Sequence, residues 1–105
     1  MSFDSAKSLK DKELRGRILK ALNTEFPAPL SVEMLLIALR AARYSCTTGQ
    51  LKTHLAYLAE KGYLTIQSVG VWEMDLARDM VKLTADGVDV VAGNIPPAPG
   101  VIINA

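Results

Sequence analysis

Residues 47–62 carry a complete set of start and stop signals for one helix, and they constrain the fold more than any other segment. The run Thr47-Thr-Gly-Gln50 is a capping box, in which the Thr47 hydroxyl accepts the Gln50 N–H and the Gln50 side chain reaches back to Thr47. An apolar stripe at helical spacing follows, made of Leu51, Leu55 and Leu58. Gly62 stands where a left-handed residue closes a helix. We therefore predict a helix over 48–61.

After Gly62 the apolar period changes to two, which is typical of strands. Three short segments alternate in this way, namely 64–69, 71–76 and 80–84. They predict a small β wing between 63 and 84, with a bulge or bend at Gly70 and a turn at 77–79.

Local signals predict three further helices, over 5–24, 32–42 and 85–92. The first ends at the segment Phe26-Pro-Ala-Pro-Leu30, because proline cannot donate to a helix ladder. Ser31 is a good N-cap for the second, which is apolar almost all round and is expected to be buried. Thr84 caps the last helix and Gly93 closes it.

The chain has 105 residues, enough for one hydrophobic core. We predict one domain over 1–93, followed by a proline-rich extended arm over 94–105. The arm has an apolar end, Val101-Ile-Ile103, which we expect to pair with the domain's own surface or with a second copy.

Targeting signals and cysteine usage favour a cytoplasmic protein. The longest apolar run has six residues, Met34 to Leu39, against the roughly 20 that span a bilayer. The first residues show no signal peptide. A single cysteine, Cys46, fits a reducing compartment. No membrane association is expected.

The order helix, helix, short turn, capped helix, hairpin is that of a helix-turn-helix with a β wing. The stretch TTGQLKTHLAYLAEKGYL, from Thr47 to Leu64, resembles the recognition helix and first wing strand of winged-helix regulators of the MarR, ArsR and PadR kinds. Lys82-Leu-Thr-Ala-Asp-Gly87 resembles the segment that closes many such wings. The resemblance implies a mainly α fold with a small β wing, a winged helix-turn-helix.

A narrower resemblance concerns both ends of the chain. The N-terminal MSFDS and the segment LTADGVDVVAGNIPPAPGV are similar to small proteins of Mu-like bacteriophages and prophages. This resemblance implies a phage gene expressed in the cytoplasm of a bacterial host cell. That family has no settled function, so the match bears on origin and fold.

In a recognition helix the N-terminal and outward residues reach DNA while the apolar stripe stays in the core. The predicted DNA-binding residues are Thr47, Thr48, Gln50, Lys52, Thr53, Tyr57 and Arg78. Gln50 can bond adenine, although capping competes for its side chain, and Lys52 suits a phosphate or guanine. In the wing Arg78 and Lys82 stand among three carboxylates, Glu73, Asp75 and Asp79, which oppose phosphate binding.

The net charge of +1 hides an asymmetry. Residues 1–63 hold ten Lys and Arg against six Asp and Glu, whereas residues 64–105 hold two against five. The basic excess is densest in the first helix. Such a distribution marks either a face for phosphate or a solvated helix surface.

No catalytic or metal-binding pattern is present. His54 is the only histidine, and Cys46 does not stand at metal-ligand spacing from it. We interpret His54 as a helix-surface residue and Cys46 as a small buried hydrophobe. No cofactor site and no enzyme activity are predicted.

The leading hypothesis is a winged-helix protein that binds double-stranded DNA as a transcriptional regulator or DNA-associated accessory factor. A symmetric DNA site needs two recognition helices, so a homodimer is expected, through the first helix, the arm or both. The alternative is a protein–protein interaction adaptor that keeps the fold without binding DNA.

Overall fold

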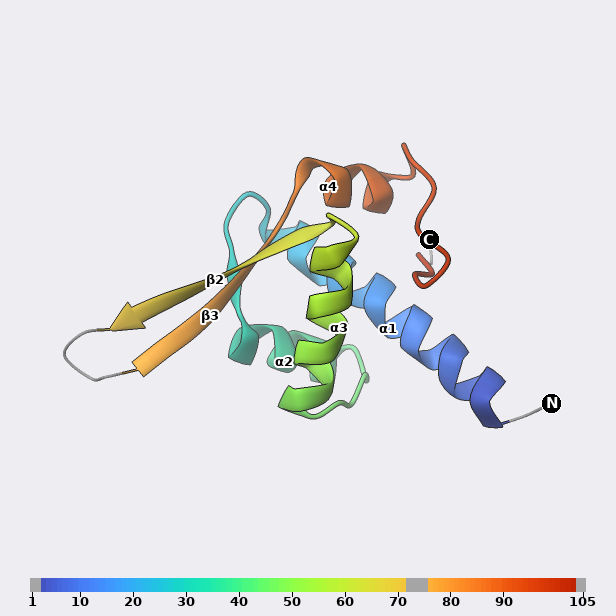
Figure 1. Ribbon diagram of the computed structural model, residues 1–105, viewed down its shortest axis with the longest axis horizontal. Helices are drawn as coiled ribbons and strands as arrows, with labels where there is room; N and C mark the ends of the chain where they lie inside the picture. The colour runs from blue at the N-terminus through green and yellow to red at the C-terminus, as the bar shows by residue number, and fades with distance from the viewer. Residues whose placement is uncertain (1–2, 72–75, 104–105) are drawn as a thin grey trace.

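The computed structural model describes residues 3–71 and 76–103, with side chains described over 7–70 and 78–103 (Figure 1). Its elements in chain order are α1 Phe3–Glu25, β1 Leu30–Ser31, α2 Val32–Ala41, α3 Thr48–Glu60, β2 Leu64–Val71, β3 Leu76–Leu83 and α4 Ala85–Ala92. The predicted class, mainly helical with a small antiparallel sheet, is confirmed.

The longest helix, α1, supplies the base of the core. Leu14, Ile18 and Leu22 stand at helical spacing along one side of α1 and are buried, and Leu19 beside them is also fully buried. The sheet, α2, α3 and α4 all contact this helix. The N-terminal half of α1 extends beyond the other helices (Figure 1).

The second helix, α2, starts as predicted, because the Met34 N–H donates to Ser31 Oγ at 3.1 Å. It buries one face, made of Val32, Leu35 and Leu39. The expectation of burial all round is wrong, because the side chains of Met34 and Ile37 are 52% and 59% exposed. At 3.6 residues per turn these two lie opposite the buried face, where no described element packs.

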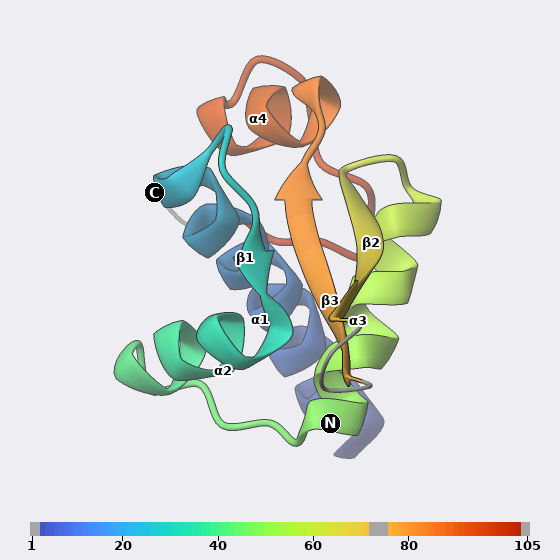
Figure 2. The same cartoon turned by 90° about the vertical axis from the view of Figure 1, so that its left-hand side faces the viewer.

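The sheet contains a strand that sequence reasoning missed. Its order is β1-β3-β2, with β1 pairing antiparallel to β3 through Leu30↔Val81 and Ser31↔Met80 (Figure 2). A strand of two residues is too short to show a period of two. The segment after Pro29 was therefore predicted only as a connection.

The hairpin of β2 and β3 is more regular than predicted. Pairing runs without interruption from Leu64↔Leu83 to Val71↔Leu76. The bulge expected at Gly70 and the turn expected at 77–79 are both wrong, since these residues belong to the ladder. Backbone hydrogen bonds continue the hairpin into solvent, past the residues whose side chains pack on the core. The break in the apolar alternation at 77–79 therefore did not mark the end of the strand pair. Figure 1 shows the hairpin projecting away from the helices.

Two glycines and one threonine end and start helices as predicted. Gly62 and Gly93 have φ values of +80° and +82°, the left-handed conformation that closes α3 and α4. The Thr84 hydroxyl accepts the Gly87 N–H at 3.1 Å and donates to the Gly62 carbonyl oxygen. Thr84 therefore joins the end of α3 to the start of α4.

The arm folds back onto its own domain. The Ala98 N–H donates to the Tyr63 hydroxyl at 2.9 Å, and the Ile102 N–H donates to the Lys12 carbonyl oxygen at 3.1 Å. Val101 is 3% exposed and joins the core. Of the two surfaces expected for the apolar end, the structure has the domain's own, and the segment does not form a strand.

The fit of the arm depends on a glycine in the middle of α1, which yields a first prediction. A Cβ at Gly16 would overlap the carbonyl oxygen of Ile102. We expect Gly16→Ala to displace the arm and to lower the free energy of unfolding by about 1–3 kcal/mol, measured by urea titration. Gly49→Ala is the control, because a Cβ there meets nothing closer than 3.9 Å and favours the helix. Equal stability of the wild type and Gly16→Ala would contradict the close packing of the arm against Gly16.

Candidate nucleic-acid interface

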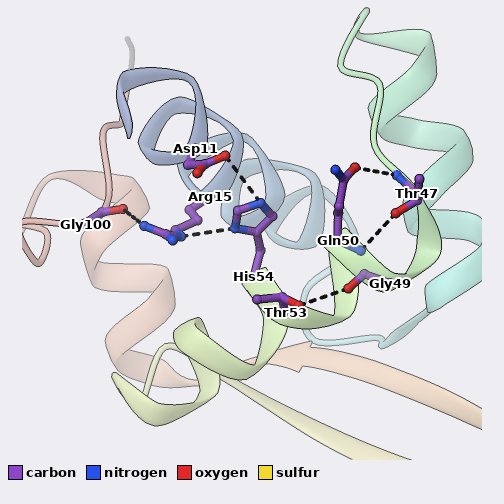
Figure 3. A network of polar contacts seen from close by, with 8 residues as sticks. All are labelled: Asp11, Arg15, Thr47, Gly49, Gln50, Thr53, His54 and Gly100. Atoms are coloured by element: carbon purple, nitrogen blue, oxygen red, sulfur yellow. Dashed lines mark hydrogen bonds and ion pairs between the residues drawn. The ribbon is translucent and has the colours of Figure 1, made fainter. Parts of the chain in front are cut away.

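The capping box predicted for α3 is formed and fixes where the helix begins. The Gln50 N–H donates to Thr47 Oγ1 at 3.1 Å, and Gln50 Oε1 accepts the Thr47 N–H at 2.9 Å (Figure 3). One lone pair of the Gln50 oxygen is used in this way, so Gln50 keeps its amide hydrogens and the second lone pair for a ligand. It can donate to a phosphate or a base acceptor, and the paired contact to adenine competes with the cap for that oxygen.

The buried face of α3 defines an opposite, exposed face. Leu51, Leu55 and Leu58 are at most 1% exposed and point into the core. On the other side of the helix lie residues that are all exposed, namely Gly49, Lys52, Thr53, Ala56 and Glu60. We call this set the exposed face of α3. Small residues dominate it, so the helix backbone can approach a partner closely.

Five of the predicted DNA-binding residues lie on or beside this face. Thr47, Thr48, Gln50, Lys52 and Thr53 are all exposed near the first turns of α3. The Thr53 hydroxyl donates to the Gly49 carbonyl oxygen at 3.1 Å, so its oxygen lone pairs and its methyl group remain for a ligand. The structure brings these five together, and their role in DNA binding stays a prediction.

Tyr57, the sixth residue, lies on the flank of α3 and is half-buried. The Arg15 guanidinium carbon is 4.2 Å from the centre of its ring, and Lys61 Nζ is 5.5 Å away. A Cβ at Gly100 of the arm would overlap the Tyr57 hydroxyl. Tyr57 is thus committed to contacts within the chain rather than to the exposed face.

His54 is buried, so its interpretation as a surface residue is wrong. Its side chain sits between α3 and α1, where Arg15 Nε donates to His54 Nδ1 at 3.2 Å (Figure 3). His54 Nε2 lies 3.8 Å from Asp11 Oδ1. The spacing contained the signal, because His54 stands three residues after Leu51 and four before Leu58, within the apolar stripe.

Arg15 links three parts of the molecule, and sequence reasoning missed it. Besides His54 and the ring of Tyr57, it reaches the arm, where its Nη1 donates to the Gly100 carbonyl oxygen at 3.0 Å. The position of α3 on α1 is therefore tied to the position of the arm. No local sequence pattern announces a contact between residues so far apart.

His54 is held in its neutral form. Burial lowers the pKa of His54, the positive charge of Arg15 lowers it further, and Asp11 acts in the opposite direction. Because Nδ1 accepts a hydrogen bond from Arg15, the proton of the neutral ring is on Nε2, facing Asp11.

A cavity of about 650 Å³ opens beside the start of α3. It lies between the first turns of α1, the connection from α2 to α3 and the first half of α3. Its wall includes Gln50, Thr53 and His54. Cys46, interpreted as a small buried hydrophobe, also lines the cavity and is partly buried against the core. Desolvation raises the pKa of its thiol.

Comparison with known proteins settles the architecture. A PadR-like transcription factor from Bacteroides fragilis superposes with a TM-score of 0.73 at 20% identity, covering 87% of this chain and 84% of that one. Bacillus subtilis PadR in complex with operator DNA superposes with a TM-score of 0.63, also at 20% identity. The chain has a winged-helix fold.

The likeness is one of structure and not of sequence. No family model matches this winged-helix chain, and no curated protein is similar to it in sequence. It spans 52% of the Bacillus subtilis PadR chain, so about half of that protein has no counterpart here. The first of these two structures is described as a transcription factor and the second as a complex with operator DNA, and neither is described as an enzyme or as a phage protein.

The wing of this winged helix is the β2–β3 hairpin. Arg78, the seventh predicted DNA-binding residue, is exposed on β3 opposite Val69. The acidic Glu73 and Asp75 lie outside the described residues. Arg78 remains a prediction.

Within residues 3–71 and 76–103, no group of three or more His, Cys, Asp or Glu side chains is placed to hold a metal ion. None of the helices in the described part of the chain has both the length and the apolar character needed to cross a bilayer.

The environment of His54 predicts a pH-dependent stability. The unfolded chain takes up a proton on His54 near pH 6.5, about its ordinary pKa, whereas the folded chain takes it up only at lower pH. Between these two values the unfolded state binds more protons, so stability falls as the pH drops. Urea titrations between pH 7.5 and 5 should show this loss in the wild type. Because His54 is the only histidine, the loss should be absent in His54→Gln. The same pH dependence in both proteins would contradict the neutral buried ring.

Proposed function

We propose that this winged-helix protein binds double-stranded DNA through the exposed face of α3, as a transcriptional regulator or DNA-associated accessory factor. The observation that carries the proposal is the exposed, capped start of α3, with Lys52 and three threonines beside a projecting hairpin. A recognition helix uses its first turns to reach base edges in the major groove, and the wing lies on the flanking backbone. Its likeness to Bacillus subtilis PadR, a protein solved with operator DNA, supports this proposal.

The phage or prophage origin is part of the same proposal. It rests on the resemblance of the two ends of the chain to proteins of Mu-like bacteriophages. A regulator of this size, with its action in the cytoplasm of the bacterial host, fits that origin. Phage-derived duplexes are therefore the first DNA to test beside random sequences.

Substitution on the exposed face tests DNA binding. Lys52→Glu and Thr53→Glu each place a carboxylate against phosphates or base acceptors, so each should weaken binding by about tenfold or more. The measurement is fluorescence anisotropy on random and phage-derived duplexes over a series of salt concentrations. Lys61→Glu is the control, with the same change of charge as Lys52→Glu, at the opposite end of α3. Wild-type protein that binds no duplex at low salt would refute DNA binding.

A homodimer completes the proposal, with α1 as its interface. The arm is already seated on its own domain, so the first helix is the better of the two interfaces predicted. Leu9 is 50% exposed on α1, and its side of the helix is turned away from the one that carries Leu14 and Ile18. Pairing across Leu9 would place two copies of α3 in one assembly while each arm stays in place.

Light scattering at tens of micromolar tests this interface. The wild type should run as a dimer, and Leu9→Glu should run as a monomer, because a buried unpaired carboxylate is costly. Ile37→Glu, on another exposed apolar side chain, should leave the dimer intact. A monomeric wild type would refute the dimer, and dissociation by Ile37→Glu alone would move the interface to α2.

One observation favours the adaptor function as a second candidate. The exposed Met34 and Ile37 of α2 lie on a face that no described element covers. Adjacent exposed apolar side chains of this kind mark surfaces for protein contacts. An adaptor would use this face and would leave the exposed face of α3 free. Absence of DNA binding in the anisotropy measurement would favour this function.

A further inference from the structure

Three basic residues of α1 near the cavity have different environments. Arg15, further along the helix, is half-buried and bonds His54 and the arm. Lys7 and Lys10, in the first turns, are exposed and line the cavity of about 650 Å³ beside α3. Arg15 therefore holds the fold together, whereas Lys7 and Lys10 are open to a partner.

A third cation reaches the same cavity from the end of α2. Arg43 has a φ of +68°, the left-handed conformation in which glycine is favoured. The Tyr44 N–H donates to the Leu39 carbonyl oxygen at 2.8 Å, which closes the helix in the usual way around such a residue. Arginine thus stands where the backbone itself would prefer glycine, and it lines the cavity.

The rest of the lining mixes donors and acceptors. The Ser45 hydroxyl and the Gln50 amide N–H groups can donate to a ligand, whereas the Thr53 hydroxyl gives its proton to the Gly49 carbonyl oxygen and can only accept. Two carboxylates also line the cavity. Asp11 lies 3.8 Å from the Nε2 of His54, and Glu13 also lines a smaller neighbouring hollow together with Arg17. The three cations of the lining outnumber its two carboxylates, so the cavity carries a net positive charge.

We propose that this cavity is a second DNA contact, which seats the phosphate backbone beside the groove occupied by α3. The inference rests on the proposed DNA binding and adds the first turns of α1 to the interface. Gln50 and Thr53 belong both to the cavity wall and to the start of α3, so a strand flanking that helix passes the cavity mouth. The N-terminal part of α1 extends past the other helices (Figure 1). Lys7 and Lys10 are exposed in its first turns and line the cavity, so they can contact such a strand. Phosphate is the ligand that lysine, arginine and hydroxyl donors suit together.

Removal of single cations tests the contact. Lys10→Ala and Arg43→Gly each take away one charge, and glycine also suits the backbone conformation at position 43. Each variant should bind about tenfold more weakly, by the same factor on unrelated duplexes, because phosphate contacts carry no sequence information. Each should also reduce the slope of log affinity against log salt by about 0.9. Lys61→Ala, an exposed cation at the far end of α3, should change neither quantity.

The outcomes separate this contact from the proposed function. Wild-type protein that binds DNA while Lys10→Ala and Arg43→Gly bind equally well, with unchanged slopes, overturns the cavity contact alone. Wild-type protein that binds no DNA overturns both. A titration with inorganic phosphate distinguishes a free anion from the DNA backbone, with chloride at equal ionic strength as the control. If low millimolar phosphate shifts the amide resonances of Ser45 and Gln50, the cavity is a site for a small anion, and the DNA contact is overturned. We expect these resonances to shift with duplex DNA and not with phosphate alone.

Discussion

The apolar side of α1 is the surface on which the whole molecule is assembled. Ile18, Leu19 and Leu22 are almost fully buried, and helices from every later part of the chain meet them. Burial of such side chains supplies the main favourable energy of a small domain, on the order of 1.5–3 kcal/mol for each one fully buried. The orientation of the exposed face of α3 is therefore a consequence of how α3 rests on α1. Any change that tilts α3 on this surface also moves the face that we propose as the DNA contact.

Local signals made the helices and caps predictable. The box of Thr47 and Gln50, the left-handed Gly62 and the cap at Thr84 each lie within a few residues of what they control. The general location of a wing also followed from a change of period. The energies that decide these features are those of neighbouring residues, so the sequence alone was sufficient.

Other features depended on partners far along the chain. The two-residue β1 exists because β3 offers it a free edge for pairing. His54 is buried because Arg15 and Asp11 of α1 contact its ring. The exposure of Met34 and Ile37 likewise reflects which sides of α2 the fold leaves open. In the candidate interface the sequence indicated the residues of α3 but neither the cavity nor Arg43. Those depend on three segments that only the tertiary fold brings together.

The seat of the arm has a consequence for the order of events during synthesis. The Ile102 N–H bonds the carbonyl oxygen of Lys12, so the arm completes a contact between segments that are translated far apart in time. Domains begin to form while the ribosome is still adding residues, and contacts of large sequence separation come late. A nascent chain that has produced α4 but not the arm already contains every element that packs on α1, while the carbonyl oxygen of Lys12 still lacks its N–H donor from Ile102. The arrival of the arm would then fasten α1 to a segment that is translated much later.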